Sequence, residues 1–297
     1  MNTSKLTLAV LGPGGVGGLI AALLARAEHR VICLAGDRTA DVLRRDGLRV
    51  DSEQYGAFTA AVEADTRLRE PVDAVFVTVK QTALDEALDR VPADVLGAAV
   101  VVPLLNGVDH LAVLRRRLPS AQIVAGTIRV EATRTAPGRI AHTSPFTQLE
   151  LGAPVVEFAE VLRQAGLDVS VRDNESAVLW DKLAFLAPFA LLTTRHRADV
   201  GTVRSGHRAE LLAVLDEVAA VARAGGAPVT AEGLLSLFDR IPETMKSSMQ
   251  RDAEAGLPLE LDAIGGAVLR AGAAHGFATP ATARLVAEVA QSTGRVA

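Results

Sequence analysis

Unbroken apolar runs alternate with amphipathic stretches through the first half of the chain. Two such runs, Thr7–Leu11 and Val31–Ala35, flank an Ala/Leu-rich segment of helical character at Leu19–Ala27. Two further runs, Asp73–Val79 and Ala98–Pro103, have the continuous hydrophobicity that is typical of strands covered on both faces. The pattern predicts parallel strands connected by helices, beginning with one βαβ unit.

The same alternation continues to about residue 172. Further helices are expected at Thr39–Asp46, Thr82–Val91 and Phe158–Ala165, and further strands at Gln122–Val130, Arg139–Leu151 and Leu167–Arg172. Pro137-Gly138 is typical of a turn. Residues 1–172 are therefore predicted to form an α/β domain with a Rossmann-type doubly wound sheet.

After residue 172 the hydrophobic period becomes that of α-helices. Helices are expected at Asn174–Leu192, His207–Gly225, Ala231–Ile241, Leu259–Gly276 and Thr282–Gln291. This predicts an all-α C-terminal domain over residues 173–297. No flexible linker interrupts the chain, so we expect the two domains to pack closely around a cleft.

A glycine-rich loop joins the first strand to the first helix. Gly12, Gly14 and Gly17 fit the G-x-G-x-x-G pattern in its required context, with Gly15 and Val16 between them. Gly12 allows a tight turn, Gly14 leaves room for a pyrophosphate, and Gly17 lets the helix approach the strand. The helix N-terminus then offers free N–H groups to phosphates. The loop predicts dinucleotide binding; the alternative is a purely structural turn.

The composition and charge of the chain disfavour two classes of binding partner. The 297 residues are 49% hydrophobic and carry a net charge of −4 without a basic block, which disfavours nucleic acid and anionic membranes. The single cysteine, Cys33, lies in an apolar run and cannot form a disulfide within the chain. No secretory signal is visible, and the apolar stretch Leu183–Leu192 is about half a membrane span. We expect a cytoplasmic protein.

Two polar side chains follow the ends of predicted strands, where open α/β sheets bind ligands. Asn106-Gly107 comes shortly after the strand that ends at Pro103, and Lys80 ends the strand Asp73–Val79. Both have a simpler interpretation. Asn-Gly forms turns without any ligand, and a lysine at a strand end is commonly solvated.

Three further candidates lie in the predicted helical domain. Lys182 opens an apolar stretch, where a desolvated ammonium gives up its proton more readily near neutral pH; the alternative is a side chain that reaches to solvent. Glu260 precedes a glycine-rich helix and could bind a ligand or complement the helix dipole. Ser247-Ser248 could cap a helix or supply a hydroxyl pair. The six histidines show no metal-ligand spacing with a carboxylate or cysteine, so no metal site is expected.

These motifs, taken in order, resemble those of the ketopantoate reductase family over nearly the whole chain. The resemblance is carried by LGPGGVGG at 11–18, VTVK at 77–80, LNGV at 105–108, WDKL at 180–183, SSMQRD at 247–252 and ELDAIGG at 260–266. It implies reduction of a 2-keto acid to a 2-hydroxy acid with NADPH, ketopantoate to pantoate. Pantothenate biosynthesis is the pathway that this reaction implies.

The resemblance also implies roles for individual residues. Lys182 matches the family's catalytic proton donor, and Asn106 matches an asparagine that positions substrate and cofactor. Glu260 matches the substrate-binding glutamate, and Ser248 the serine that holds the substrate carboxylate. Lys80 matches a lysine near the cofactor, which the glycine loop Gly12, Gly14, Gly15, Val16 and Gly17 is expected to bind.

The chain departs from the family pattern in its substrate region. The family often has asparagines four and eight residues after the catalytic lysine, whereas this chain has Leu186 and Ala190. Two polar groups are thus missing from one helix face. We therefore expect either a more apolar carbonyl substrate or a rearranged pantoate site.

The second departure concerns the cofactor. The family usually has an arginine directly after the second strand, where this chain has Gly36, Asp37 and Arg38. Asp37 is placed as an acid that binds the ribose hydroxyls of NAD, and Arg38 could neutralise the 2′-phosphate of NADP. The family resemblance favours NADPH, with NADH as the alternative.

Two other functions fit the same residues. One is a dinucleotide-binding sensor without turnover, which the loss of polarity at Leu186 and Ala190 allows but the retained Lys182, Asn106 and Glu260 disfavour. The other is a β-hydroxyacid or opine-type dehydrogenase of similar domain plan. The expected partner is a small keto acid, without nucleic acid or membrane, and the apolar-rich helical domain leaves room for a homodimer.

Overall fold

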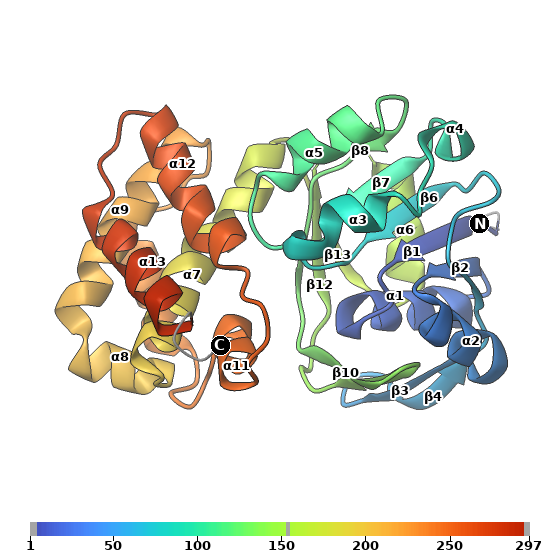
Figure 1. Cartoon of the computed structure of the whole chain (residues 1–297), viewed down its shortest axis with the longest axis horizontal. Helices are drawn as coiled ribbons and strands as arrows, with labels where there is room; N and C mark the ends of the chain where they lie inside the picture. The colour runs from blue at the N-terminus through green and yellow to red at the C-terminus, as the bar shows by residue number, and fades with distance from the viewer. Residues whose placement is uncertain (1–4, 153–154, 294–297) are drawn as a thin grey trace. The chain divides into compact units, whose positions relative to one another are not determined.

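The computed structural model describes residues 5–152 and 155–293 and divides into two compact units (Figure 1). The first unit comprises Met1–Leu105 and His110–Glu175, and the second comprises Asn106–Asp109 and Ser176–Ala297. Strands and helices build the first unit, whereas helices build the second. This is the α/β and all-α organisation that the hydrophobic periods predict.

A six-stranded parallel sheet forms the centre of the first unit, in the order β5-β2-β1-β6-β7-β8. The strands are β1 (Thr7–Leu11), β2 (Arg30–Leu34), β5 (Glu63–Asp65), β6 (Ala74–Val77), β7 (Val100–Pro103) and β8 (Gln122–Ile123). The connecting elements are α1 (Gly15–Arg26), α2 (Asp37–Asp46), η1 (Gln81–Ala83), α3 (Leu84–Leu88), α4 (Ala93–Leu96) and α5 (His110–Arg117). The chain runs outward from β1 in both directions, so the Rossmann-type prediction is confirmed and β1 lies at the switch point.

Cys33 lies in β2 and is fully buried. Burial raises the pKa of its thiol to about 12, so the side chain is an inert core residue. Its neighbours on the same strand, Ile32 and Leu34, are also buried, as expected for a strand covered on both faces.

Within residues 122–152, only β8 extends the parallel sheet, whereas the sequence predicted that the later strands would also join it. The expected strand Gln122–Val130 is divided into β8 and β9 (Gly126–Arg129), and the expected strand Arg139–Leu151 into β11 (Arg139–His142) and β12 (Gln148–Gly152). β12 pairs with β9 on one side and with β13 (Asp168–Arg172) on the other, which forms a separate three-stranded sheet. Short irregular segments, at residues 124–125 and 143–147, separate the two strands of each predicted run, and the hydrophobic pattern does not reveal them.

A third sheet, in the order β10-β11-β3-β4, was missed in large part. Its other strands are β3 (Leu48–Ser52), β4 (Gly56–Ala60) and β10 (Ala132–Ala136). Leu48 and Val50 are buried while Arg49 and Asp51 are exposed, which is the alternation of a strand covered on one face. Helix α1 contacts β1 and β2 as well as β3, β10 and β11. Being covered on both sides, α1 is apolar nearly all round.

The second unit is entirely helical apart from its loops, within the residues described. Its helices are α7 (Glu175–His196), α8 (Val200–Gly206), α9 (Arg208–Ala224), α10 (Ala231–Arg240), α11 (Ser248–Glu254), the π-helical turn η2 (Asp262–Gly266), α12 (Ala267–Ala274) and α13 (Pro280–Thr293). Helix α6 (Val156–Gln164) belongs to the first unit. The expected helix at Leu259–Gly276 is present as a continuous helical segment over residues 261–274, and its first part has π-helical rather than α-helical hydrogen bonding.

Helix α7 is the core of the second unit. By length and composition it could cross a membrane, but 78% of its most apolar window is buried inside the protein. It continues through Pro188 to His196, beyond the expected end at Leu192. Leu183, Ala187 and Leu191 are buried in the hydrophobic core of this unit, which explains the apolar stretch as a core helix.

Candidate functional site

The glycine loop between β1 and α1 has the close contacts that its pattern predicts. Gly12 has φ +87°, and an added Cβ would collide with Val79. Gly17 lies against Thr78 and the Gly12 carbonyl, with no space for a side chain. The Thr78 hydroxyl donates to the carbonyls of Leu11 at 3.0 Å and Gly12 at 2.8 Å. Thr78 therefore fixes the end of β1, a contact that sequence reasoning missed.

Gly14 and Gly15 differ in what surrounds them. A Cβ at Gly14 would meet its nearest described neighbour, the Gly12 carbonyl oxygen, only at 3.9 Å. A Cβ at Gly15 would overlap the carbonyl of Ala132 in β10. Gly15 is thus required by packing against the third sheet, whereas Gly14 borders open space.

The start of α1 fits the pyrophosphate of a dinucleotide. Gly14 occupies the N-cap position, and the first helical residues are Gly15, Val16 and Gly17. No carbonyl of the helix lies four residues before these positions, so their N–H groups point outward with the positive end of the helix dipole. The first turn holds no acidic side chain. Glycine cradle, exposed donors and positive potential together suit a phosphate group.

The segment after β2 is exposed. Gly36 is the N-cap of α2, and Asp37 and Arg38 are its first residues, all three exposed to solvent. A Cβ at Gly36 would meet no described atom within 4 Å. Both charged side chains are therefore free to approach a ligand beside the carboxyl end of β2.

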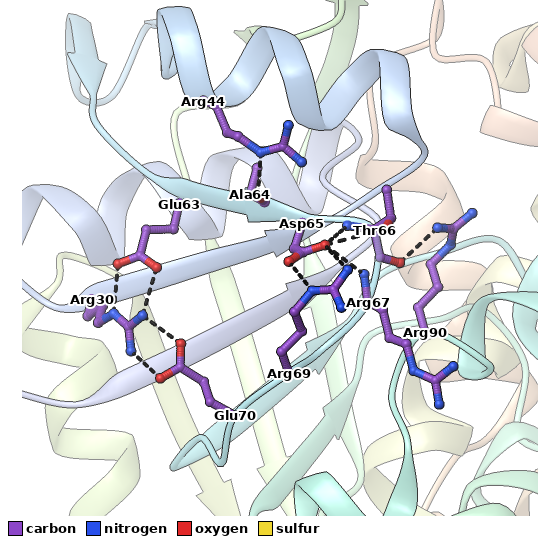
Figure 2. A network of polar contacts seen from close by, with 10 residues as sticks. All are labelled: Arg30, Arg44, Glu63, Ala64, Asp65, Thr66, Arg67, Arg69, Glu70 and Arg90. Carbon is purple, nitrogen blue, oxygen red and sulfur yellow. Dashed lines mark hydrogen bonds and ion pairs between the residues drawn. The ribbon is translucent and has the colours of Figure 1, made fainter.

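A network of polar contacts connects the residues at the carboxyl ends of β2 and β5 (Figure 2). Arg90 donates to the carbonyls of Ala35 at 3.2 Å and Thr66 at 2.9 Å, which joins the ends of β2 and β5. Arg69 donates to Asp65 at 2.7 Å and lowers the pKa of that carboxyl to about 2, with the Thr66 N–H contributing. Sequence reasoning missed this bracing, since Arg90 lies 55 positions from Ala35.

At the opposite end of β2, Arg30 pairs with two exposed carboxylates, Glu63 on β5 and Glu70 (Figure 2). The shortest contacts are 2.7 Å to Glu63 and 2.6 Å to Glu70. Exposed pairs of this kind stabilise a protein only slightly. The arrangement holds the short edge strand β5 in register and lies away from the glycine loop.

Asn106 and Glu260 meet in the second unit. The Asn106 side-chain amide donates to the Glu260 carboxylate at 2.9 Å, and Glu260 is only 8% exposed. Gly107, with φ +89°, lies so close to Ala263 in η2 that a side chain would overlap its carbonyl. The Asn-Gly turn is therefore packed directly against the π-turn, and π-turns are common at functional sites.

An ion-pair network fastens this turn. Arg270 in α12 donates to Asp109 at 2.7 Å and to Asp262 at 2.7 Å. Hydrogen bonding to Asp262 and then to Asp109 raises the pKa of the Arg270 guanidinium. Asp262 thus has a structural partner. Sequence reasoning did not find Arg270, because 161 positions separate it from Asp109.

Lys182 is half-buried on α7. One turn later on the same face Leu186 is half-buried, and a further turn later Ala190 is fully buried. Phe185 and Phe189 stack on each other at 5.5 Å between ring centroids. The helix therefore presents aliphatic and aromatic surroundings where the family often has asparagines.

The two serines at the start of α11 have different environments. Ser247 is buried at the N-cap, accepts the Gln250 N–H at 3.1 Å and hydrogen-bonds with Thr193 of α7 at 2.8 Å. Ser248 is exposed. The capping role belongs to Ser247, so the Ser248 hydroxyl remains accessible.

The structure brings Asn106 and Glu260 into direct contact. Lys182 and Ser248 lie in the same unit as that pair, whereas the glycine loop and Lys80 lie in the other. Lys80 is exposed at the N-cap of η1, three residues after the end of β6. The candidate residues therefore fall into two groups: the glycine loop and Lys80 in the first unit, and Asn106, Glu260, Lys182 and Ser248 in the second.

Comparison with known proteins finds matches in both units. The family model "Ketopantoate reductase PanE/ApbA" matches residues 8–155, and the model of the C-terminal part of the same family matches residues 174–292. The chain belongs to the ketopantoate reductase family. It is accordingly an NAD(P)H-dependent oxidoreductase that acts on CH–OH and C=O groups.

Relatives in this family cover nearly the whole chain. A 2-dehydropantoate 2-reductase of Mycobacterium tuberculosis is 31% identical over 94% of this chain and 95% of its own length, and one of Caulobacter vibrioides is 29% identical over 95% and 97%. A ketopantoate reductase structure from Ralstonia eutropha superposes with a TM-score of 0.88 at 27% identity, covering 97% of this chain and 99% of that one. A D-mandelate dehydrogenase solved with NADH shares the fold, with a TM-score of 0.87 at 19% identity over 97% of this chain and 99% of that one.

Proposed function

We propose that this ketopantoate reductase family member reduces a 2-keto acid to the 2-hydroxy acid with NADPH in the cytoplasm. Ketopantoate is the first substrate to test, because relatives named 2-dehydropantoate 2-reductase match over most of the chain. The observation that carries the proposal is the hydrogen bond between Asn106 and the buried Glu260. It holds a carboxylate and an amide ready for a small polar substrate.

The dinucleotide fits the first unit. Its pyrophosphate would lie on the start of α1, held by the N–H groups of Gly15, Val16 and Gly17, with Gly12 and Gly14 leaving the approach open. When bound, the cofactor supplies the hydride that attacks the keto carbon. Lys80, exposed after β6, would add a positive charge near the phosphates or ribose.

Lys182 would serve as the proton donor. Negative charge develops on the keto oxygen as the carbonyl is reduced, and an ammonium held close to that oxygen stabilises it and then delivers a proton. Half-burial on α7 supports this role, since the low-polarity surroundings strengthen the interaction. Ser248, exposed at the start of α11, would bind the substrate carboxylate.

Glu260 would orient Asn106 as well as bind substrate. A carboxylate accepts hydrogen bonds only, so the Asn106 Nδ2 must point to Glu260 and the amide oxygen must point elsewhere. That oxygen is left as an acceptor in a defined direction. Glu260 therefore sets the direction of the amide dipole, and its carboxylate would accept a substrate hydroxyl.

A more apolar 2-keto acid is the second candidate substrate. Leu186 and Ala190 stand where the family often has asparagines, and both pack with the aliphatic core of the second unit. A hydroxyl placed against this face would lose hydrogen bonds, whereas an aliphatic or aryl group would gain contact. The values of kcat/KM for hydroxylated 2-keto acids and for aliphatic or aryl 2-keto acids decide between the two candidates.

The test is turnover with a panel of 2-keto acids bearing hydroxylated, aliphatic and aryl side chains. NADPH and NADH are each supplied, and oxidation of the nicotinamide is followed by absorbance. Lys182→Ala should abolish turnover while leaving cofactor affinity unchanged, and Lys5→Ala on the surface of the first unit is the control. Cofactor binding without turnover of any keto acid would refute the reductase and favour the sensor.

The proposal includes a homodimer, the commonest assembly of soluble enzymes. Light scattering coupled to size-exclusion chromatography measures the mass directly. A mass near that of one 31.0 kDa chain, unchanged with protein concentration, would refute this part alone.

A further inference from the structure

Three side chains that commonly bind metals meet at the C-terminal end of α7. His196 is the last residue of α7, His207 immediately precedes α9, and Glu210 lies in the first turn of α9. His196 and Lys182 are 14 residues apart on one helix, which at 1.5 Å per residue separates them by about 21 Å. The cluster is therefore distinct from the residues proposed for reduction.

The three side chains are already close to one another. His196 Nε2 lies 2.6 Å from Glu210 Oε2, and the rings of His196 and His207 stack with 3.5 Å between centroids. One nitrogen or oxygen from each of the three lies within 4.8 Å of the other two. All three are half-buried, so their side chains are less mobile than surface residues.

We propose that His196, His207 and Glu210 form a binding site for a divalent transition-metal ion, with Zn²⁺ as the reference ion. Two imidazoles and one carboxylate match Zn²⁺ sites that keep a fourth position for water. Ligand atoms around a tetrahedral Zn²⁺ lie roughly 3.3 Å apart, given bonds of about 2.0–2.2 Å.

The neighbouring side chains orient the carboxylate for this role. Arg284 in α13 donates to Glu210 Oε1 at 2.8 Å, which leaves Oε2 directed at His196. Ligating carboxylates are commonly held in this way by a second hydrogen bond. Arg195 pairs with Glu288, and Glu288 also interacts electrostatically with His196. Two arginines thus pair with the two carboxylates beside His196.

Metal binding would join the end of α7 to the start of α9. The segment between them contains α8, and Arg197, directly after His196, has a φ of +50°. An ion bound by His196, His207 and Glu210 together would fix the end of α7 to the start of α9. The expected consequence is stabilisation of the second unit, because an ion that binds only the folded chain shifts the folding equilibrium.

The sequence reasoning missed this cluster for a specific reason. His207 and Glu210 are only three residues apart, and the sequence analysis overlooked this pair. The third ligand, His196, is separated from them by α8, and only the fold brings it back. The expectation of no metal site rested on spacing along the chain alone.

The experiment uses the full chain, with any affinity tag removed and the protein treated with a chelator. Co²⁺ is titrated while the visible absorbance bands of four-coordinate Co²⁺ are followed, and Zn²⁺ is then added as competitor. Isothermal titration with Zn²⁺ gives the stoichiometry and Kd, and thermal unfolding is measured with and without Zn²⁺. We expect saturable one-to-one binding, displacement of Co²⁺ by Zn²⁺, and a higher Tm with Zn²⁺.

Variants separate this site from non-specific binding. His207→Gln and Glu210→Gln should each weaken Zn²⁺ binding by about a hundredfold or more, since removal of a supporting residue alone costs about 10–100-fold. Both should keep the cofactor affinity of the parent. His275→Gln, an exposed histidine after α12, is the matched control and should bind like the parent. Equal Zn²⁺ affinity in all four proteins, or no saturable binding by the parent, would overturn the site.

Discussion

The side-chain amide of Asn106 donates a 2.9 Å hydrogen bond to the carboxylate of Glu260, a residue 154 positions further along the chain. Gly107 packs against Ala263 of the π-turn, and Arg270 joins Asp109 to Asp262, so the Asn-Gly turn is held from both sides. The pair is therefore built into the second unit rather than left on a mobile loop.

Glu260→Gln removes the charge while keeping the side chain's size. The amide of glutamine accepts a weaker hydrogen bond from Asn106 and can present its own NH₂ instead, so the direction of the Asn106 amide is no longer fixed. We expect kcat/KM to fall by about tenfold to a hundredfold, which corresponds to a charged hydrogen bond of about 1.5–3 kcal/mol. Steady-state kinetics measures this, and Glu232→Gln, exposed on α10, is the control. An unchanged kcat/KM in Glu260→Gln would show that the reaction does not require the Glu260 carboxylate.

Gly14→Ala and Gly15→Ala form a matched pair. A methyl group at Gly14 faces open space, so the Tm should stay near that of the parent while dinucleotide affinity falls as the pyrophosphate approach is blocked. A methyl group at Gly15 overlaps the Ala132 carbonyl, so both stability and affinity should fall. Thermal unfolding and fluorescence titration with NADPH measure the two effects. Equal Tm losses in both variants would contradict the distinction.

Arg38→Ala tests how the chain discriminates between cofactors. If Arg38 pairs with the 2′-phosphate, its loss should weaken NADPH binding by about tenfold or more and leave NADH binding nearly unchanged. Arg45→Ala, at the other end of α2 and paired with Asp46, is the control. If the parent protein instead prefers NADH, and Asp37→Asn removes that preference, then Asp37 is the residue that binds the cofactor ribose.

Leu186→Asn restores a polar side chain one turn after Lys182. We expect the ratio of kcat/KM for a hydroxylated over an aliphatic 2-keto acid to rise by about tenfold, because one hydrogen-bonding group discriminates by that order or more. Leu212→Asn, at an exposed position on α9, controls for the same substitution away from the site. An unchanged ratio would show that this face of α7 does not select the substrate.

Asp65 makes the free energy of unfolding depend on pH in the acidic range. Its pKa is lowered to about 2 in the folded protein, below the ordinary value of 3.8, through Arg69 and nearby N–H groups. The contribution is therefore complete above pH 3.8 and is lost as the pH falls toward 2. Asp65→Asn should cost less than about 1 kcal/mol at neutral pH, as befits a partly exposed pair, and should flatten the stability curve between these pH values. Denaturant unfolding at several pH values measures this, and a curve parallel to the parent's would contradict it.

The sequence by itself determined the elements whose hydrophobic pattern is local. Continuous apolar runs gave β1, β2, β6 and β7 as strands buried on both faces, and the 3.6-residue period gave the helices of the second unit. The glycine loop could be identified because its spacing acts within a single strand–turn–helix. Each of these features depends on residues that are only a few positions apart, so the pattern can be found in the sequence itself.

Only the tertiary structure decided which distant residues meet. It placed the third sheet across α1, which explains why Gly15 tolerates no side chain, and it paired Asn106 with Glu260, Arg270 with Asp109, and His196 with Glu210. The physical reason is that the energy of a contact depends on distance in space, whereas sequence patterns record only periodicity along the backbone. Burial of apolar faces chooses the packing, and that packing then brings together polar groups that no local pattern relates.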